Sequence, residues 1–216
     1  SSLGISLVPY KVCNFDCIYC QLGKTTVKTA QRKEYVKIKD ILTELKEFIS
    51  APDFKNMHID YISLSGTGEP LLNSRIFDLI KGIREITPIP IVLITNAFFL
   101  KDKKVRKEIL GVDVILPSLD AIDTPTFEVV DRPSGKIDAQ GIIDGLIALR
   151  REFSGKIYLE IMVIKGVNDN TDNFKKFKEI ITKIKPDKIH INVPRRHTTE
   201  TGVFIPEEKT LKKIKE

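Results

Sequence analysis

The sequence predicts an α/β protein built on a parallel sheet. Six short apolar segments rich in isoleucine and valine alternate along the chain with longer amphipathic stretches, which is the pattern of repeated strand–helix units. Some of the short segments, such as VDVILPSL and YLEIMVI, are almost wholly apolar, as is typical of strands covered on both faces. The chain has 216 residues, and six units of about 30 residues would use most of them. We therefore expect a single domain over residues 1–216.

The elements follow from the apolar pattern in order along the chain. The expected strands are Ile5–Val8, Ile59–Ser65, Ile91–Thr95, Val112–Leu119, Ile157–Ile164 and Lys188–Val193. Between and after them, apolar residues recur at spacings of three and four and predict the helices Ile38–Ile49, Ile76–Ile86, Lys101–Leu110, Ala139–Phe153, Thr171–Lys185 and Glu207–Lys215. Pro186 ends the fifth of these helices.

Two closures of the sheet remain open from pattern alone. One is a flat, doubly wound sheet, and the other is a partial (β/α)6 barrel with parallel strands. In both, ligands bind at the carboxyl ends of the strands. Motifs that directly follow a strand are therefore expected on the functional rim.

Composition excludes several classes of protein. The fractions of apolar (42%) and charged (30%) residues are those of a globular chain that buries a core, and no apolar run reaches the roughly 18 residues of a membrane-spanning helix. The amino terminus lacks the layout of a secretory signal, and we expect a cytoplasmic protein with no membrane partner. The net charge of +6 comes mainly from residues 171–216, with a second basic group, Lys24, Lys28, Arg32 and Lys33, after the cysteines. Such charge is a solvated surface or a site for an anionic partner such as RNA.

The three cysteines are the sharpest feature of the sequence. Cys13, Cys17 and Cys20 lie within eight residues, after the first expected strand, and the chain has no other cysteine. An odd, clustered set predicts a metal or redox site in a reducing compartment. Zinc is one alternative, but a structural zinc site needs four ligands and the three histidines are distant in sequence. A four-iron cluster suits three thiolates better, because one iron is left open for a ligand.

The CxxxCxxC spacing, with Tyr19 before the last cysteine, resembles the signature of the radical S-adenosylmethionine (radical SAM) superfamily. Further motifs agree in order along the chain: SGTGEP over residues 65–70, TNA over 95–97, SLDA over 118–121, DRP over 131–133 and GVND over 166–169. The resemblance is strongest to a group of iron–sulfur oxidoreductases related to the wyosine tRNA synthases. Archaeal wyosine synthases carry extra cysteines that this chain lacks. Members of the group also extend further, so the chain is expected to be a fragment.

The resemblance implies a radical SAM core, and with it the partial (β/α)6 barrel with parallel strands. It implies two cofactors, a [4Fe-4S] cluster on the three cysteines and S-adenosylmethionine on the open iron. It also implies residues that bind S-adenosylmethionine. Gly66, Gly68 and Glu69 would hold the methionine amino group, Asn96 follows the next strand, Ser118 and Asp120 would bind the ribose or the carboxylate, and Tyr19 and Asn192 would lie near the adenine. The expected reaction is reductive cleavage to a 5′-deoxyadenosyl radical, which abstracts hydrogen from a substrate, with electrons from a low-potential donor.

The substrate is expected to contact the rim loops. Arg132, Arg195 and Arg196 follow strands and could grip a phosphate or carboxylate, which favours RNA as the substrate. The small number of aromatic residues speaks against RNA. One alternative function is an activase that installs a glycyl radical on a partner protein. The other is a non-catalytic iron–sulfur binding module.

Overall fold

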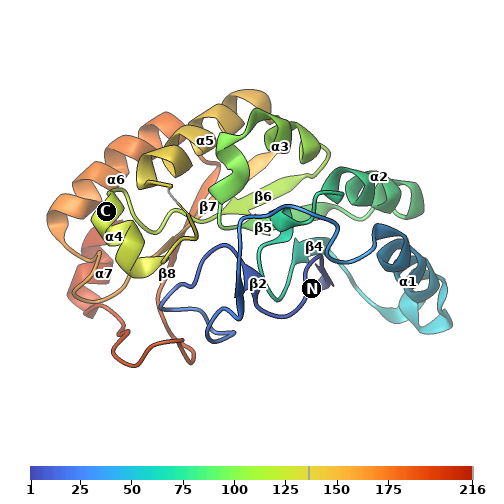
Figure 1. The fold of residues 1–216 in the computed structure, drawn as a ribbon, viewed down its shortest axis with the longest axis horizontal. Coiled ribbons are helices and arrows are strands. Elements are labelled where there is room, and N and C mark those ends of the chain that lie inside the picture. Colours follow the sequence, from blue (N-terminus) through green and yellow to red (C-terminus); the bar gives the residue numbers. More distant parts are fainter. Residues whose placement is uncertain (136, 216) are drawn as a thin grey trace.

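The main sheet consists of six parallel strands that follow one another in space in the same order as in the chain. The computed structural model describes residues 1–135 and 137–215 (Figure 1). The sheet order is β1-β4-β5-β6-β7-β8. A doubly wound sheet reverses its strand order near the middle. Because no reversal occurs and β1 and β8 end the sheet as edges, the partial barrel is the correct closure. The strands are β1 Ser2–Ser6, β4 Tyr61–Ser65, β5 Ile91–Thr95, β6 Val114–Pro117, β7 Lys156–Met162 and β8 Lys188–Asn192.

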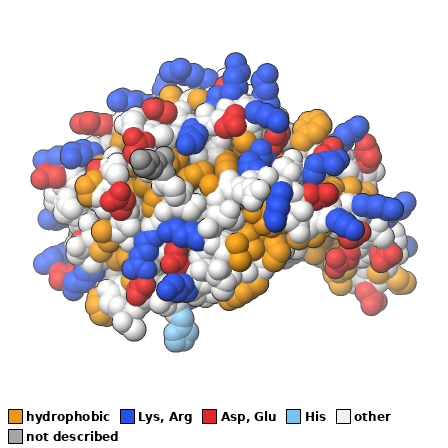
Figure 2. Space-filling view, in the orientation of Figure 1, with side chains coloured by type: hydrophobic (Ala, Val, Ile, Leu, Met, Phe, Trp, Pro, Cys, Tyr) orange, Lys and Arg blue, Asp and Glu red, His pale blue; other side chains and the backbone are white. Residues whose placement is uncertain are grey.

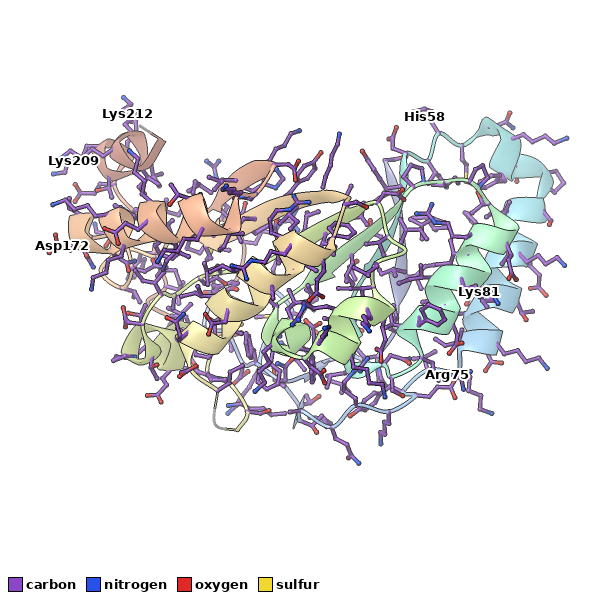
Figure 3. All side chains as sticks on the ribbon, turned by 90° about the horizontal axis from the view of Figure 1, so that it is seen from above. His58, Arg75, Lys81, Asp172, Lys209 and Lys212 are labelled. Carbon is purple, nitrogen blue, oxygen red and sulfur yellow. The ribbon has the colours of Figure 1, made fainter. Side chains whose placement is uncertain are left out.

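Helices cover the outer side of this sheet. Figure 1 shows α2, α3, α5 and α6 along the outer side, with the blue segment around β2 on the opposite side. The helix α1 packs beside α2, and α5 packs beside α6. In a view from above, His58 and Lys81 mark the α1–α2 end of the molecule, and Asp172 and Lys212 mark the α6–α7 end (Figure 3). The helices are α1 Ile38–Ser50, α2 Ile76–Ile86, α3 Lys103–Glu108, α4 Thr124–Val130, α5 Ala139–Glu152, α6 Thr171–Ile184 and α7 Glu208–Lys215.

The two faces of the strands differ in burial, and β7 shows this clearly. Ile157, Leu159 and Ile161 are buried in the main core, while Tyr158, Glu160 and Met162 alternate with them and are only half buried. Side chains alternate between the two faces of a strand. The less buried set therefore belongs to the inner face of the barrel. Parallel register places Ser118, which follows β6, level with Glu160 of β7 and His190 of β8.

Several details differ from the pattern in the sequence, among them helix α4, which was not expected. The first strand ends at Ser6, because Leu7 and Val8 are buried but lie in the loop that leads to the cysteines. The expected helix over Lys101–Leu110 is divided into a short 3-10 helix, Phe98–Lys101, and α3, since Asp102 accepts a hydrogen bond from the backbone of Lys104 and begins a new helix there. A two-stranded parallel ladder of β2 (Val12–Cys13) and β3 (Val27–Lys28) was not expected from the sequence.

No helix in the described part of the chain has the length and apolar character needed to cross a membrane.

Candidate iron–sulfur and S-adenosylmethionine site

The cysteine loop lies between two other loops at the carboxyl ends of the strands. On one side, the backbone amide of Lys11 donates a hydrogen bond of 2.6 Å to the carbonyl of Thr67 in the SGTGEP motif. On the other side, Asp16 and Ile18 donate backbone hydrogen bonds of 3.0 and 2.9 Å to the carbonyls of Asp131 and Val130. The loop is thus held along both edges, which limits where its thiols can point.

The three thiols are free and partly buried. Burial, followed by the charge of Glu69, raises the pKa of Cys13 to about 12, and the charge of Cys20 contributes in the same direction. Burial, followed by the charge of Asp131, raises the pKa of Cys17, and the charge of Cys13 adds to this. The Cys17 Sγ lies 3.4 Å from Oδ1 of Asp131. The space beside these thiols is the candidate cofactor site.

The donor set of this space fits an iron–sulfur cluster. Among residues 1–135 and 137–215, no three His, Cys, Asp or Glu side chains are placed to hold a single metal ion. A four-iron cluster takes each thiolate on a different iron and does not require the sulfurs to converge on one point. Asn14, next to Cys13, is fully buried, and its Nδ2 has no hydrogen-bond partner in the described part of the chain. A cluster sulfur is an acceptor that could satisfy this donor.

The SGTGEP motif packs tightly against the cysteine loop, and its glycines are required there. A Cβ at Gly68 would lie 1.9 Å from the carbonyl oxygen of Val12. Gly66 has a φ of +121°, a conformation that L side chains rarely adopt. Gly68 therefore allows the close approach of the two loops, while a Cβ at Gly66 would meet Ser6 at the end of β1.

Glu69 is buried, and both of its carboxylate oxygens already accept hydrogen bonds within the protein. The donors are the backbone of Leu71 at 3.0 Å, the hydroxyl of Thr95 at 2.7 Å and the backbone of Asn96 at 2.9 Å. Burial raises the pKa of Glu69 to about 7, although these hydrogen bonds act in the opposite direction. Glu69 thus joins the SGTGEP loop to the end of β5.

The predicted residues after β5 and β6 lie together. Asn96, Ser118 and Asp120 line one small cavity with Phe15 and Asp131. The Nδ2 of Asn96 donates a hydrogen bond of 2.9 Å to Oδ1 of Asn14 and lies 3.8 Å from Sγ of Cys13. The sequence motifs that follow separate strands therefore meet beside the first cysteine.

Asp120 and Tyr19 form a buried pair. The Tyr19 hydroxyl donates a hydrogen bond to the carboxylate of Asp120, which also accepts one of 2.7 Å from the backbone of Met162. Burial raises the pKa of Asp120 to about 6, although these hydrogen bonds lower it. Asn192 lies at the end of β8, level with Met162, and its Nδ2 is 3.4 Å from Glu160.

The three arginines predicted to contact substrate have different surroundings. Arg132 has a φ of +47° and forms an ion pair of 2.5 Å with Glu200. Arg196 donates a hydrogen bond of 2.8 Å to Gln21, directly after the cysteines, and Arg195 is exposed. Arg132 thus joins the DRP segment to the segment after β8.

One member of the second basic group is a structural residue. Arg32 is paired with Glu108 at 2.5 Å, and its Nε donates to the carbonyl of Leu71 at 2.7 Å. Lys24, Lys28 and Lys33 remain exposed. On the face shown in Figure 2, Lys and Arg side chains are spread widely, with acidic side chains between them.

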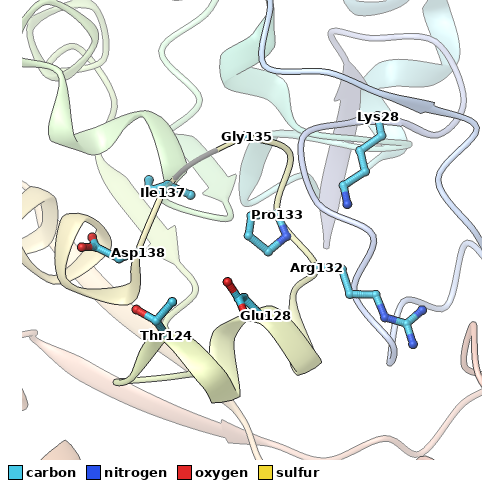
Figure 4. Close-up of a pocket in the computed structure, with 8 residues that line it drawn as sticks. All are labelled: Lys28, Thr124, Glu128, Arg132, Pro133, Gly135, Ile137 and Asp138. Atoms are coloured by element: carbon cyan, nitrogen blue, oxygen red, sulfur yellow. The ribbon is translucent and has the colours of Figure 1, made fainter.

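A pocket of about 640 Å³ lies beside the DRP segment. Lys28 and Arg132 line it together with Glu128 of α4 and Asp138, which caps α5 (Figure 4). Its charges are mixed, so it does not by itself select an anion.

Three further residues of the site escaped prediction. Asp131 is buried beside Cys17, and Lys11 is buried beside Cys20. Asn168 is also buried, and its side chain forms hydrogen bonds with the backbone of Ile164, Met162 and Asp120. Asp131 and Asn168 lie in motifs that the sequence places on the rim, but their type does not reveal a supporting role. A lysine two residues before a cysteine carries no signal of burial.

Comparison with known proteins agrees with this geometry. The model of the "Radical SAM superfamily" matches residues 7–177. The "GTPase Obg" of Brachyspira hyodysenteriae is 36% identical over 215 residues, which are 100% of this chain and 31% of that protein. A UPF0026 protein of Methanocaldococcus jannaschii is 30% identical over 213 residues, which are 99% of this chain and 65% of that protein. The chain thus spans less than two thirds of both curated relatives.

Solved structures support the fold. A structure of TYW1 with a lysine-pyruvate adduct bound has a TM-score of 0.69 at 19% identity, covering 98% of this chain and 71% of that chain. A radical SAM methyltransferase from Sphaerobacter thermophilus has a TM-score of 0.72 at 15% identity, covering 99% of this chain and 62% of that chain. At these identities the likeness shows the fold alone. With the family model matching residues 7–177, the chain belongs to the radical SAM superfamily, whose members use a [4Fe-4S] cluster and S-adenosylmethionine.

Proposed function

We propose that the chain is the core of an enzyme that cleaves S-adenosylmethionine reductively and abstracts hydrogen from a substrate. Cys13, Cys17 and Cys20 would hold the [4Fe-4S] cluster. The observation that carries the proposal is the placement of these cysteines between the SGTGEP loop and the DRP segment, at the carboxyl ends of the strands. With both cofactors bound, electron transfer to S-adenosylmethionine supplies a 5′-deoxyadenosyl radical.

The protein's own part in this reaction is to position groups and exclude water. Glu69, with both oxygens bonded inside the protein, holds the SGTGEP loop to the end of β5, and Gly68 lets that loop approach the backbone of Val12. The polar groups of this loop would hold the methionine amino group. Asn96, whose Nδ2 lies 3.8 Å from Sγ of Cys13, and Ser118 would orient the rest of the cofactor. Tyr19 and Asp120 act through their hydrogen bond, which fixes the wall of the site.

The test is anaerobic reconstitution with iron and sulfide, followed by iron counting and measurement of 5′-deoxyadenosine after reduction with S-adenosylmethionine. We expect about four irons per chain and formation of 5′-deoxyadenosine. A Cys17→Ser variant should lose both, while Lys24→Ala, an exposed change on the same loop, should retain both. Iron binding without 5′-deoxyadenosine would favour a non-catalytic iron–sulfur module instead.

We propose RNA as the substrate class. Exposed cations support this: Arg196 is bonded to Gln21, which brings the pair Arg195–Arg196 beside the cysteine loop, and Lys24 and Lys28 follow that loop. Binding of transfer RNA should weaken steeply with salt, and an Arg195→Ala/Arg196→Ala variant should show a smaller salt dependence. Equal binding by wild type and variant would argue against RNA. Formation of a glycyl radical on a partner protein would identify an activase.

A further inference from the structure

Lys11 is a buried lysine whose backbone is fixed on both sides. Its amide donates to the carbonyl of Thr67 at 2.6 Å, and its carbonyl accepts from the amides of Thr26 and Val27, both at 3.2 Å. Its φ is +56°, a left-handed conformation that is uncommon for a residue other than glycine. These hydrogen bonds to the SGTGEP loop and to residues 26 and 27 fix the position of the Lys11 backbone, and with it the point from which the side chain extends.

The side chain of Lys11 points to the cysteine ligands. The residue is only 2% exposed, and its Nζ lies 3.1 Å from Sγ of Cys20, its one side-chain hydrogen-bond partner in the described residues. No ion pair within 4.0 Å joins Lys11 to a carboxylate in the same part of the chain. A buried ammonium is costly unless an opposite charge lies near it. Among the described residues, the Cys20 sulfur is the group in hydrogen-bond contact with this ammonium that can carry such a charge.

Carboxylates also lie close to the cysteine loop. Asp131 lies 3.4 Å from Sγ of Cys17, and Glu69 and Asp120 are buried in the loops that follow β4 and β6. Three thiolates add three negative charges, and reduction adds one more. Net charge and hydrogen bonds to sulfur set the potentials of iron–sulfur clusters. A cation fixed at Cys20 would favour the more negative, reduced state.

We propose that Lys11 is a positioning residue for the cluster: its ammonium, held against the Cys20 sulfur, favours the reduced state and raises the reduction potential. The inference rests on the proposed cluster ligands Cys13, Cys17 and Cys20. The proposed role of Lys11 concerns the reduction of the cluster and not the cleavage of S-adenosylmethionine that follows. The quantity that tests it is therefore the reduction potential of the cluster.

The experiment compares Lys11→Met with Lys24→Met, which removes an exposed lysine of the same loop. After anaerobic reconstitution and iron counting, each protein is titrated potentiometrically, and the reduced cluster is followed by electron paramagnetic resonance. At the wild-type midpoint, we expect the ratio of reduced to oxidised cluster to fall about tenfold in Lys11→Met, a shift of roughly 59 mV for one electron. Lys24→Met should keep the wild-type midpoint, and Lys11→Arg should remain close to it. An unchanged midpoint in Lys11→Met would overturn the inference.

If Lys11→Met binds little iron, retention of iron becomes the measure, with folding checked by circular dichroism. Retention in Lys11→Arg but not in Lys11→Gln would support the role of the charge, and equal loss in both would overturn it. The proposed function is judged separately. A shifted midpoint together with no 5′-deoxyadenosine in wild type would refute the proposed cleavage but not the role of Lys11.

Discussion

Replacing Asn168 by alanine tests whether the GVND loop supports the site. The Asn168 side chain is buried at 1% exposure and forms three hydrogen bonds, from the amide of Ile164 at 2.7 Å and to the carbonyls of Met162 at 2.7 Å and Asp120 at 2.8 Å. These bonds join the end of β7 to the segment after β6. In Asn168→Ala, three buried backbone groups would lose their partner.

The size of the effect follows from those three bonds. At about 1 kcal/mol for each hydrogen bond, the free energy of unfolding should fall by about 3 kcal/mol. For a chain of 216 residues, this corresponds to a decrease in melting temperature of roughly 6–12 °C. Asn56→Ala is the matched control, because Asn56 is exposed and a surface change of this kind costs less than about 0.5 kcal/mol.

Urea unfolding followed by circular dichroism measures both variants on the same protein preparation. The midpoint should move to lower urea in Asn168→Ala, with an unchanged slope. If Asn168→Ala and Asn56→Ala unfold at the same urea concentration, the three hydrogen bonds of Asn168 do not stabilise the fold, and the reasoning is refuted.

Three further predictions concern glycine, titration and an ion pair. Gly68→Ala puts a methyl group 1.9 Å from a backbone oxygen, so it should lower the free energy of unfolding by roughly 1–3 kcal/mol and reduce iron binding. Gly4→Ala, with open space around it, should do neither. Urea unfolding and iron counting measure the two effects. The pKa of Glu69 is raised to about 7, so its contribution to stability should be fully present below pH 4.5 and be lost as the pH rises through 7. Glu69→Gln should remove this part of the pH dependence, which urea unfolding of the iron-free protein measures. Arg106→Met breaks a pair whose arginine is 6% exposed and should cost about 2 kcal/mol in urea unfolding, while Arg75→Met breaks an exposed pair and should cost under about 1 kcal/mol; equal losses would contradict the role of burial.

The fold was largely predictable, because local pattern carries it. The strand Ile91–Thr95 has the same bounds in sequence and structure, and the helices of residues 76–86 and 139–152 begin and end close to where their apolar spacing places them. The alternation of strands and helices could not distinguish a doubly wound sheet from a partial barrel, since both use it, and the resemblance to the radical SAM superfamily is what predicted the barrel. The order of strands in space settled it.

The candidate site was predictable in its membership more than in its contacts. Gly66 and Gly68 were expected from their motif; close approach to the cysteine loop explains Gly68, and a positive φ explains Gly66. Arg132, predicted to contact substrate, pairs with Glu200, which lies 68 residues further along the chain. Arg32 likewise pairs with Glu108. No pattern within one segment reveals such partners.

The sequence by itself determined the family, the three cysteines and the α/β alternation, because each depends on residue types at short, fixed spacings. The tertiary structure alone decided the burial of Lys11 against Cys20, of Asp131 against Cys17 and of Glu69 against the end of β5. The physical reason is that each contact joins a side chain to the packing of several segments. That packing decides whether a charged side chain is solvated or buried, and the residues next to it in the sequence do not.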